Sequence, residues 1–199
     1  MQRMKWFAVI ALGLATGNLS ARVGQQPNDR KQLAPLDAQR EKYALQSFLK
    51  IAERMIIPAV EAMPADKFAF APTDGEFKGV RTFGQMVKHL SATNHILAAA
   101  ALGEEPPADA GDEVGPEMVR TKAEILAYLT DSFAHLDRAI AAIGQMNTPV
   151  NSSPISPLKR GEVTRSALVV ESLIHAADHY GQLVEYLRMN GVVPPASRP

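Results

Sequence analysis

Apolar side chains recur at three- and four-residue steps in four separate stretches of this 199-residue chain. That spacing is the period of an α-helix with one buried face, so the pattern predicts four amphipathic helices. No stretch alternates convincingly at two-residue steps, so no strand is expected. The helices are predicted at about 37–63, 83–102 and 121–144, and from 162 or 164 to about 190.

Residues that start and stop helices support these limits. Thr82 is a suitable N-cap for the second helix, and Thr121 opens a capping-box pattern at the start of the third. The pair Asn190-Gly191, with two prolines shortly after it, is typical of a helix end. Pro58 lies in the last turns of the first helix, where its ring clashes with the preceding turn, and it predicts a kink or an early end.

Four helices of roughly 20–28 residues suit an antiparallel bundle, so we predict an all-α four-helix bundle with long inter-helix loops. The loops at 64–81 and 145–161 are long enough to allow a non-sequential arrangement of the helices. The fourth helix is expected to turn one apolar stripe toward the core, formed by Leu173, Ile174, Ala177, Gly181, Val184 and Leu187.

The N-terminal stretch has the pattern of a secretory signal peptide. Arg3 and Lys5 precede an apolar run at 6–15, and small and polar residues follow, with Gly17 and Ala21 as alternative cleavage positions. An apolar run of about ten to twelve residues is too short to span a ~30 Å hydrocarbon core comfortably. We therefore expect export, to the periplasm or by secretion, with no stable membrane anchor after the signal is removed.

These observations divide the chain into a signal peptide at 1–21, a polar linker at 22–35 and one helical domain at 36–199. The length suffices for one domain with a substantial core. The sequence leaves the oligomeric state open, with a homodimer as one alternative.

Composition and charge narrow the classes of function. The chain has 21 basic and 21 acidic residues without a basic cluster, so nucleic acid is not an expected partner. It has no cysteine, which excludes disulfides, thiolate ligands and a cysteine nucleophile. Any metal site must therefore use His, Asp or Glu.

Two histidines of the fourth helix have a spacing that suits a metal site. His175 and His179 are four residues apart, so they differ by about 40° around the axis and lie roughly 6 Å apart along it. One ion could contact both, but a stable imidazole site usually takes three protein ligands. A facing helix of a bundle would supply the third, with His89 and His95 of the second helix as candidates. Six residues rotate these two by about 240°, so one ion cannot readily take both.

Structural roles are the alternative for each of these residues. A histidine beside an apolar stripe is usually a hydrogen-bonded core or boundary group, which is our interpretation of His135; for His95 we expect a surface or packing role. Glu171 and Asp178 could accept a ring N–H from a ligand histidine, although such acids more often line a solvated helix face. The remaining candidates, which could line an open metal position or simply pack in the bundle, are Gln182 and Tyr186.

Two segments resemble a known family. MPADKFAFAPTDGEFKGVRTFGQMVKHLSATN at 63–94 is similar to the family's entry into its second helix, and HAADHYGQLVEYLRMNGVVPP at 175–195 is similar to its terminal helix. The family is the DinB-like (DinB/YfiT) group of four-helix bundles with a three-histidine metal centre, and the resemblance covers most of 36–199. It implies that the metal ligands are His89, His175 and His179.

The resemblance also sets the expected cofactor and chemistry. Three imidazoles leave a divalent ion with open positions for water or substrate. Zinc and nickel are the first candidates, with iron, manganese and copper as alternatives. Some relatives are metal-dependent transferases or isomerases that use low-molecular-weight thiols.

We therefore expect an exported metal-dependent hydrolase or thiol-type transferase that acts on an unidentified small molecule. The alternative is a non-catalytic metal-binding or interaction bundle in the periplasm. The sequence presents no Ser-His-Asp or Glu-based constellation, so any catalysis would depend on the metal.

Overall fold

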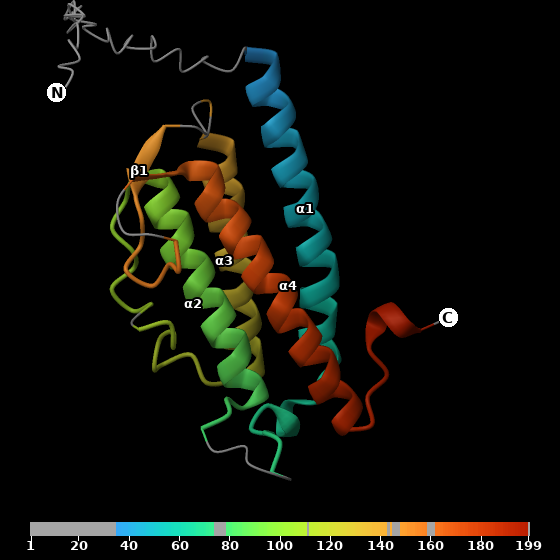
Figure 1. Cartoon of the computed structure of the whole chain (residues 1–199). Coiled ribbons are helices and arrows are strands. Elements are labelled where there is room, and N and C mark those ends of the chain that lie inside the picture. Colours follow the sequence, from blue (N-terminus) through green and yellow to red (C-terminus); the bar gives the residue numbers. More distant parts are fainter. Residues whose placement is uncertain are drawn as a thin grey trace, which may run out of the picture. The chain divides into compact units, whose positions relative to one another are not determined.

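A computed structural model describes residues 35–73, 79–110, 112–142, 144, 148–158 and 162–198. Its described part contains four long helices that form a bundle, shown in Figure 1. The prediction of an all-α four-helix bundle is therefore confirmed. The helices are α1 (Pro35–Ala62), α2 (Phe83–Leu102), α3 (Lys122–Ala142) and α4 (Arg165–Met189), and two short 3₁₀ helices, η1 (Ala65–Lys67) and η2 (Pro195–Ser197), follow α1 and α4.

The helices are not packed in sequence order. Helix α1 packs against α3 and α4, and α2 packs against the same two helices, so α1 and α2 lie diagonally across the bundle. Helices α2 and α3 run in the same direction, because Gly84 lies against Ile125 at one end and Asn94 bonds Ser132 further along (Figure 1). The expectation of an antiparallel bundle is wrong for this pair, since the connection after α2 returns the chain to the end where α2 began.

A short hairpin precedes α4. Strands β1 (Pro149–Asn151) and β2 (Glu162–Thr164) pair antiparallel, with Val150 opposite Val163. The expectation of no strand is wrong here, because three residues are too few to display a two-residue alternation. Thr164 ends β2 and caps α4, accepting a hydrogen bond from the Ala167 backbone N–H at 3.2 Å. Of the two predicted starts of α4, 164 is thus the correct one.

Local capping signals account for both ends of α2 and for the start of α3. Thr82 and Gln85 form a complete capping box at α2, and Gly103 ends that helix with a left-handed φ of 77°. Thr121 and Glu124 form the predicted box at α3, with the Glu124 carboxylate accepting from the Thr121 backbone N–H at 2.8 Å. Both predicted caps are confirmed.

Helix α1 continues through Pro58 to Ala62, close to the predicted limit at 63, so of the two alternatives for Pro58 the early end is wrong. Ala59, Val60 and Met63, which follow the proline, are fully buried in the core. Their burial offsets the hydrogen bond that the proline removes.

The buried face of α4 differs from the predicted apolar stripe at most of its positions, although Leu187 is fully buried as predicted. Ile174 is 66% exposed, and Leu173 is only partly buried. The face that enters the core instead carries Ser172, Ala176 and His179. Two faces of α4 carry apolar residues, and periodicity alone cannot show which of them enters the core. The predicted stripe lies on the face that borders a groove with α1.

The described helices include none that is long and apolar enough to cross a membrane. The predicted signal peptide at 1–21 lies outside the described residues, as does the linker up to residue 34.

Candidate metal centre

Helices α2 and α4 bring three histidines together. The Nε2 atom of His175 lies 3.1 Å from Nε2 of His89 and 2.9 Å from Nε2 of His179. One nitrogen of each residue lies within 4.8 Å of the others, which is a suitable arrangement for one metal ion. The structure thus brings together the three residues that the resemblance implies.

Two polar contacts fix the register of the antiparallel pair α2 and α4 on either side of the histidines. On one side the Ser172 hydroxyl donates to the Asn94 side-chain oxygen at 2.7 Å, with both side chains fully buried. On the other side the Tyr186 hydroxyl donates to the backbone carbonyl of Arg81 at 3.0 Å. Because the histidines lie between these contacts, the two contacts fix the axial register of α2 and α4 at the level of the three imidazoles.

The ring orientation of His89 is fixed by the loop after α2. Its Nδ1 atom lies 2.8 Å from the backbone carbonyl oxygen of Glu113, which can only accept a hydrogen bond. Nδ1 therefore carries the proton, and Nε2 presents a lone pair to the cluster. Glu113 has a φ of 65°, an uncommon value for a residue with a side chain, and its carboxylate lies 3.6 Å from the same Nδ1 atom.

The hydrogen-bonding needs of the three imidazoles fit a cation. With the His89 Nε2 atom unprotonated, a hydrogen on His175 or His179 can make a straight bond across only one of the two Nε2 contacts. The remaining contact then has no straight hydrogen bond. The Nδ1 atoms of His175 and His179 are buried without a hydrogen-bond partner in the described residues. A positive ion at the centre would satisfy all three Nε2 atoms at once.

Burial keeps the cluster unprotonated. It is the main cause that lowers the pKa of each of the three imidazoles, and the pKa of His175 falls to about 3. The neighbouring histidines lower the pKa values of His175 and His179 further, and the positive charge of Arg81 acts on all three rings in the same direction. The three side chains are therefore neutral near pH 7, which is the state that binds metal.

The acids considered as partners of the ligands have other contacts. The Glu171 carboxylate accepts from the Ser156 hydroxyl at 2.7 Å, and burial raises its pKa. Asp178 accepts from the Gln182 amide at 2.8 Å. Neither forms a hydrogen bond with a ligand ring in the described residues.

The two residues that could line an open metal position, Gln182 and Tyr186, have different surroundings in the structure. Gln182 is half-buried and donates to Asp178. The charge of Asp178 and the side-chain amide of Gln182 both raise the pKa of His179 against the effect of burial. Tyr186 is buried, and burial raises the pKa of its phenol. Its hydroxyl serves the contact with Arg81, so Tyr186 has a packing and positioning role.

His95 and His135 lie outside this cluster, as expected. Both are buried, so of the two roles considered for His95 the packing role is correct and the surface role is wrong. Their Nδ1 atoms contact each other at 3.0 Å.

Sequence reasoning missed three contributors to the site. The Glu113 carbonyl is a backbone group, which any residue would supply, so no side-chain pattern could reveal it. Asn94 and Arg81 lie in the segment that carries the resemblance. A buried Asn within an apolar helix was the available signal for Asn94, since such a side chain needs partners.

Comparisons with known proteins agree with this architecture. The family model described as the DinB superfamily matches residues 49–183, which is more than half of the chain and includes all three histidines. No curated protein matches the chain. The bundle and the family match together establish that this chain belongs to the DinB superfamily.

Proposed function

We propose that this chain is an exported metal-dependent enzyme that holds one divalent ion through His89, His175 and His179. Its reaction is hydrolysis or a thiol-type transfer on a small molecule. The observation that carries this proposal is the convergence of three neutral imidazoles on one point, with His89 and His179 buried and His175 half-buried. Zinc and nickel are the first candidates for an all-nitrogen site.

The residues of the chain have separable tasks in this proposal. A bound divalent ion would supply Lewis acidity, which lowers the pKa of a water or thiol and polarises a carbonyl. The Glu113 carbonyl keeps the His89 proton on Nδ1, so that Nε2 is free to donate its lone pair. The Asn94–Ser172 and Tyr186–Arg81 contacts hold α2 and α4 at the height where the ligands meet.

Arg81 favours a negatively charged group at this centre. Its charge acts on all three imidazoles, and no ion pair involves its guanidinium within the described residues. A cation beside a metal site stabilises an anion such as a thiolate, a carboxylate or a developing oxyanion. This supports a substrate or nucleophile that is anionic in the reacting state.

Metal content tests the first part of the proposal. We expect protein purified from its native host to retain one tightly bound divalent ion per chain, and the His179→Ala variant to lose it, because two imidazoles bind far more weakly than three. Elemental analysis after gel filtration is the measurement. Asp178→Asn, which changes the neighbouring exposed acid, is the control and should keep its metal. Full occupancy in a variant that lacks all three histidines would exclude the site.

Turnover separates the enzyme from a non-catalytic metal-binding or interaction bundle. The protein would be tested against ester, amide and thiol-acceptor substrates, and His89→Ala should abolish any turnover that is found. A metal-loaded protein without turnover on all of these classes would favour the non-catalytic alternative. Export rests on the pattern of 1–21 and is tested by fractionating host cells and sequencing the N-terminus of the mature protein.

A further inference from the structure

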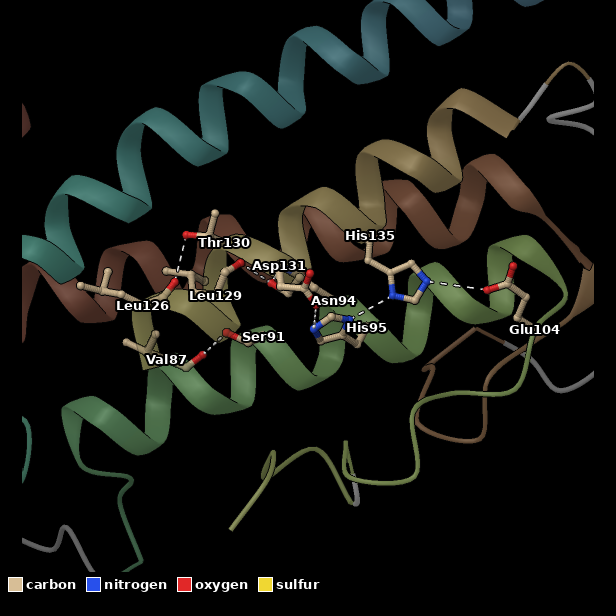
Figure 2. Close-up of polar contacts among 11 residues, drawn as sticks. Val87, Ser91, Asn94, His95, Glu104, Leu126, Leu129, Thr130, Asp131 and His135 are labelled. Atoms are coloured by element: carbon tan, nitrogen blue, oxygen red, sulfur yellow. Dashed lines mark hydrogen bonds and ion pairs between the residues drawn. The ribbon is translucent and has the colours of Figure 1, made fainter. Parts of the chain in front are cut away.

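A second pair of histidines lies between α2 and α3, apart from the candidate metal centre. His95 of α2 and His135 of α3 point toward each other, as Figure 2 shows, with their Nδ1 atoms 3.0 Å apart. The two residues are 4% and 9% exposed. This distance falls between the two Nε2 contacts of the triad, which are 2.9 and 3.1 Å.

Each ring of the pair turns its other nitrogen toward a carboxylate. The His95 Nε2 atom lies 3.7 Å from an Asp131 oxygen, and the His135 Nε2 atom lies 4.0 Å from a Glu104 oxygen. Neither Nε2 atom has a hydrogen-bond partner among the described residues. Both acids are exposed, so they lie where the buried pair meets solvent.

Two neutral imidazoles cannot satisfy this arrangement. Each has one N–H, and the Nδ1 contact uses one of the two hydrogens. The ring that donates there is left with a bare Nε2 atom facing a carboxylate, which is repulsive. If both Nε2 atoms carry hydrogens toward the acids, both Nδ1 atoms are bare. A cation must then lie between the two Nδ1 lone pairs.

A metal ion between the Nδ1 atoms meets this requirement. Ligand histidines usually donate their second ring N–H to a carboxylate, and here each ring has an acid beside it: Asp131 for His95, and for His135 the Glu104 carboxylate, which also pairs with Arg138 at 3.7 Å. Two nitrogens bound tetrahedrally at about 2.05 Å would be about 3.3 Å apart, which needs an adjustment of only a few tenths of an ångström. Burial lowers the pKa of both histidines, so both are neutral and able to bind near pH 7.

We propose that His95 and His135 form a second site for a divalent transition metal ion, bound through Nδ1 of each ring, with Asp131 and Glu104 accepting the Nε2 hydrogens. Water completes the coordination, so this site binds more weakly than the triad. The bound ion links α2 to α3, whereas the triad links α2 to α4.

The test is a titration of the mature full chain with its triad already loaded with zinc. Zn²⁺ is added at pH 7.5 and binding is followed by calorimetry. We expect a second equivalent at micromolar affinity, which both His95→Gln and His135→Gln abolish. Asp137→Asn, two residues from His135 on the same helix, is the control and should retain it. Because the triad is filled beforehand, a failure here leaves the proposed function intact.

Two results would overturn the proposal. One is that the wild type takes up no zinc beyond the equivalent already held by the triad, which would leave a shared proton as the cation. The other is an unchanged second equivalent in both glutamine variants. Circular dichroism verifies that the variants are folded. Asp131→Asn changes an exposed side chain and provides the test even if neither glutamine variant folds. It should weaken the second equivalent several-fold, and an unchanged affinity would contradict the assigned arrangement.

Discussion

His175 occupies the middle of the triad, with its Nε2 atom in contact with the Nε2 atoms of both other histidines. Burial, followed by repulsion from His179 and His89, lowers its pKa from an ordinary 6.5 to about 3. An unfolded chain restores the ordinary value. Between these two pH values the unfolded state binds more protons than the folded state, so the free energy of unfolding decreases as the pH falls.

We therefore expect metal-free protein to lose stability between about pH 6.5 and 3. Each histidine that titrates only on unfolding contributes a slope of about 1.4 kcal/mol per pH unit. Urea denaturation at pH 7, 5.5 and 4.5 measures this slope. His175→Gln keeps a polar side chain of similar size but cannot titrate, so its slope should be shallower. Equal slopes for the variant and the wild type would show that His175 is protonated in the folded state.

At the scale of elements, local signals predicted the helices better than their arrangement. Thr82 and Thr121 mark helix starts because a cap depends on residues adjacent in sequence. The parallel course of α2 and α3 depends on where the intervening chain travels, which no local pattern encodes. The buried face of α4 was missed for a related reason, since Ser172 and His179 face the core as polar residues.

Asn94 joins three helices through its side chain. It donates to the Ser132 hydroxyl of α3 at 3.2 Å and accepts from the Ser172 hydroxyl of α4 at 2.7 Å, and all three residues are fully buried. The Ser132 hydroxyl in turn donates to the Leu129 carbonyl. Removal of the amide leaves two buried groups without this partner, at about 1–3 kcal/mol each.

We expect Asn94→Ala to lower the free energy of unfolding by about 2–6 kcal/mol and to weaken metal binding by the triad, because Ser172 lies one turn before His175. The control is Ser91→Ala, since the Ser91 hydroxyl is equally buried but donates only within its own helix, to the Val87 carbonyl (Figure 2). Urea denaturation and zinc titration of both variants provide the comparison. A similar loss of stability and of zinc affinity in both variants would indicate that the hydrogen bonds of Asn94 between helices contribute to neither.

At the scale of the whole molecule, the three histidines could be selected from the sequence, but the reason that they suit a cation could not. The spacing of His175 and His179 and the resemblance around His89 selected the triad. The unsatisfied Nε2 contacts depend on the Glu113 carbonyl, which reaches His89 from a loop 24 residues away. Only the folded chain places that loop, so the protonation of His89 could not be predicted from the sequence.

The triad joins segments 86 residues apart, so metal binding should stabilise the whole bundle. An ion that binds only the folded state at 100 times its Kd adds about 2.7 kcal/mol, which corresponds to a rise in Tm of about 5–10 °C for a domain of this size. Differential scanning calorimetry with a chelator and with zinc measures the rise. His179→Ala should abolish most of it, whereas His135→Gln should leave it nearly intact, since the tighter site dominates at low zinc concentration. An equal rise in His179→Ala would mean that the stabilising ion binds elsewhere.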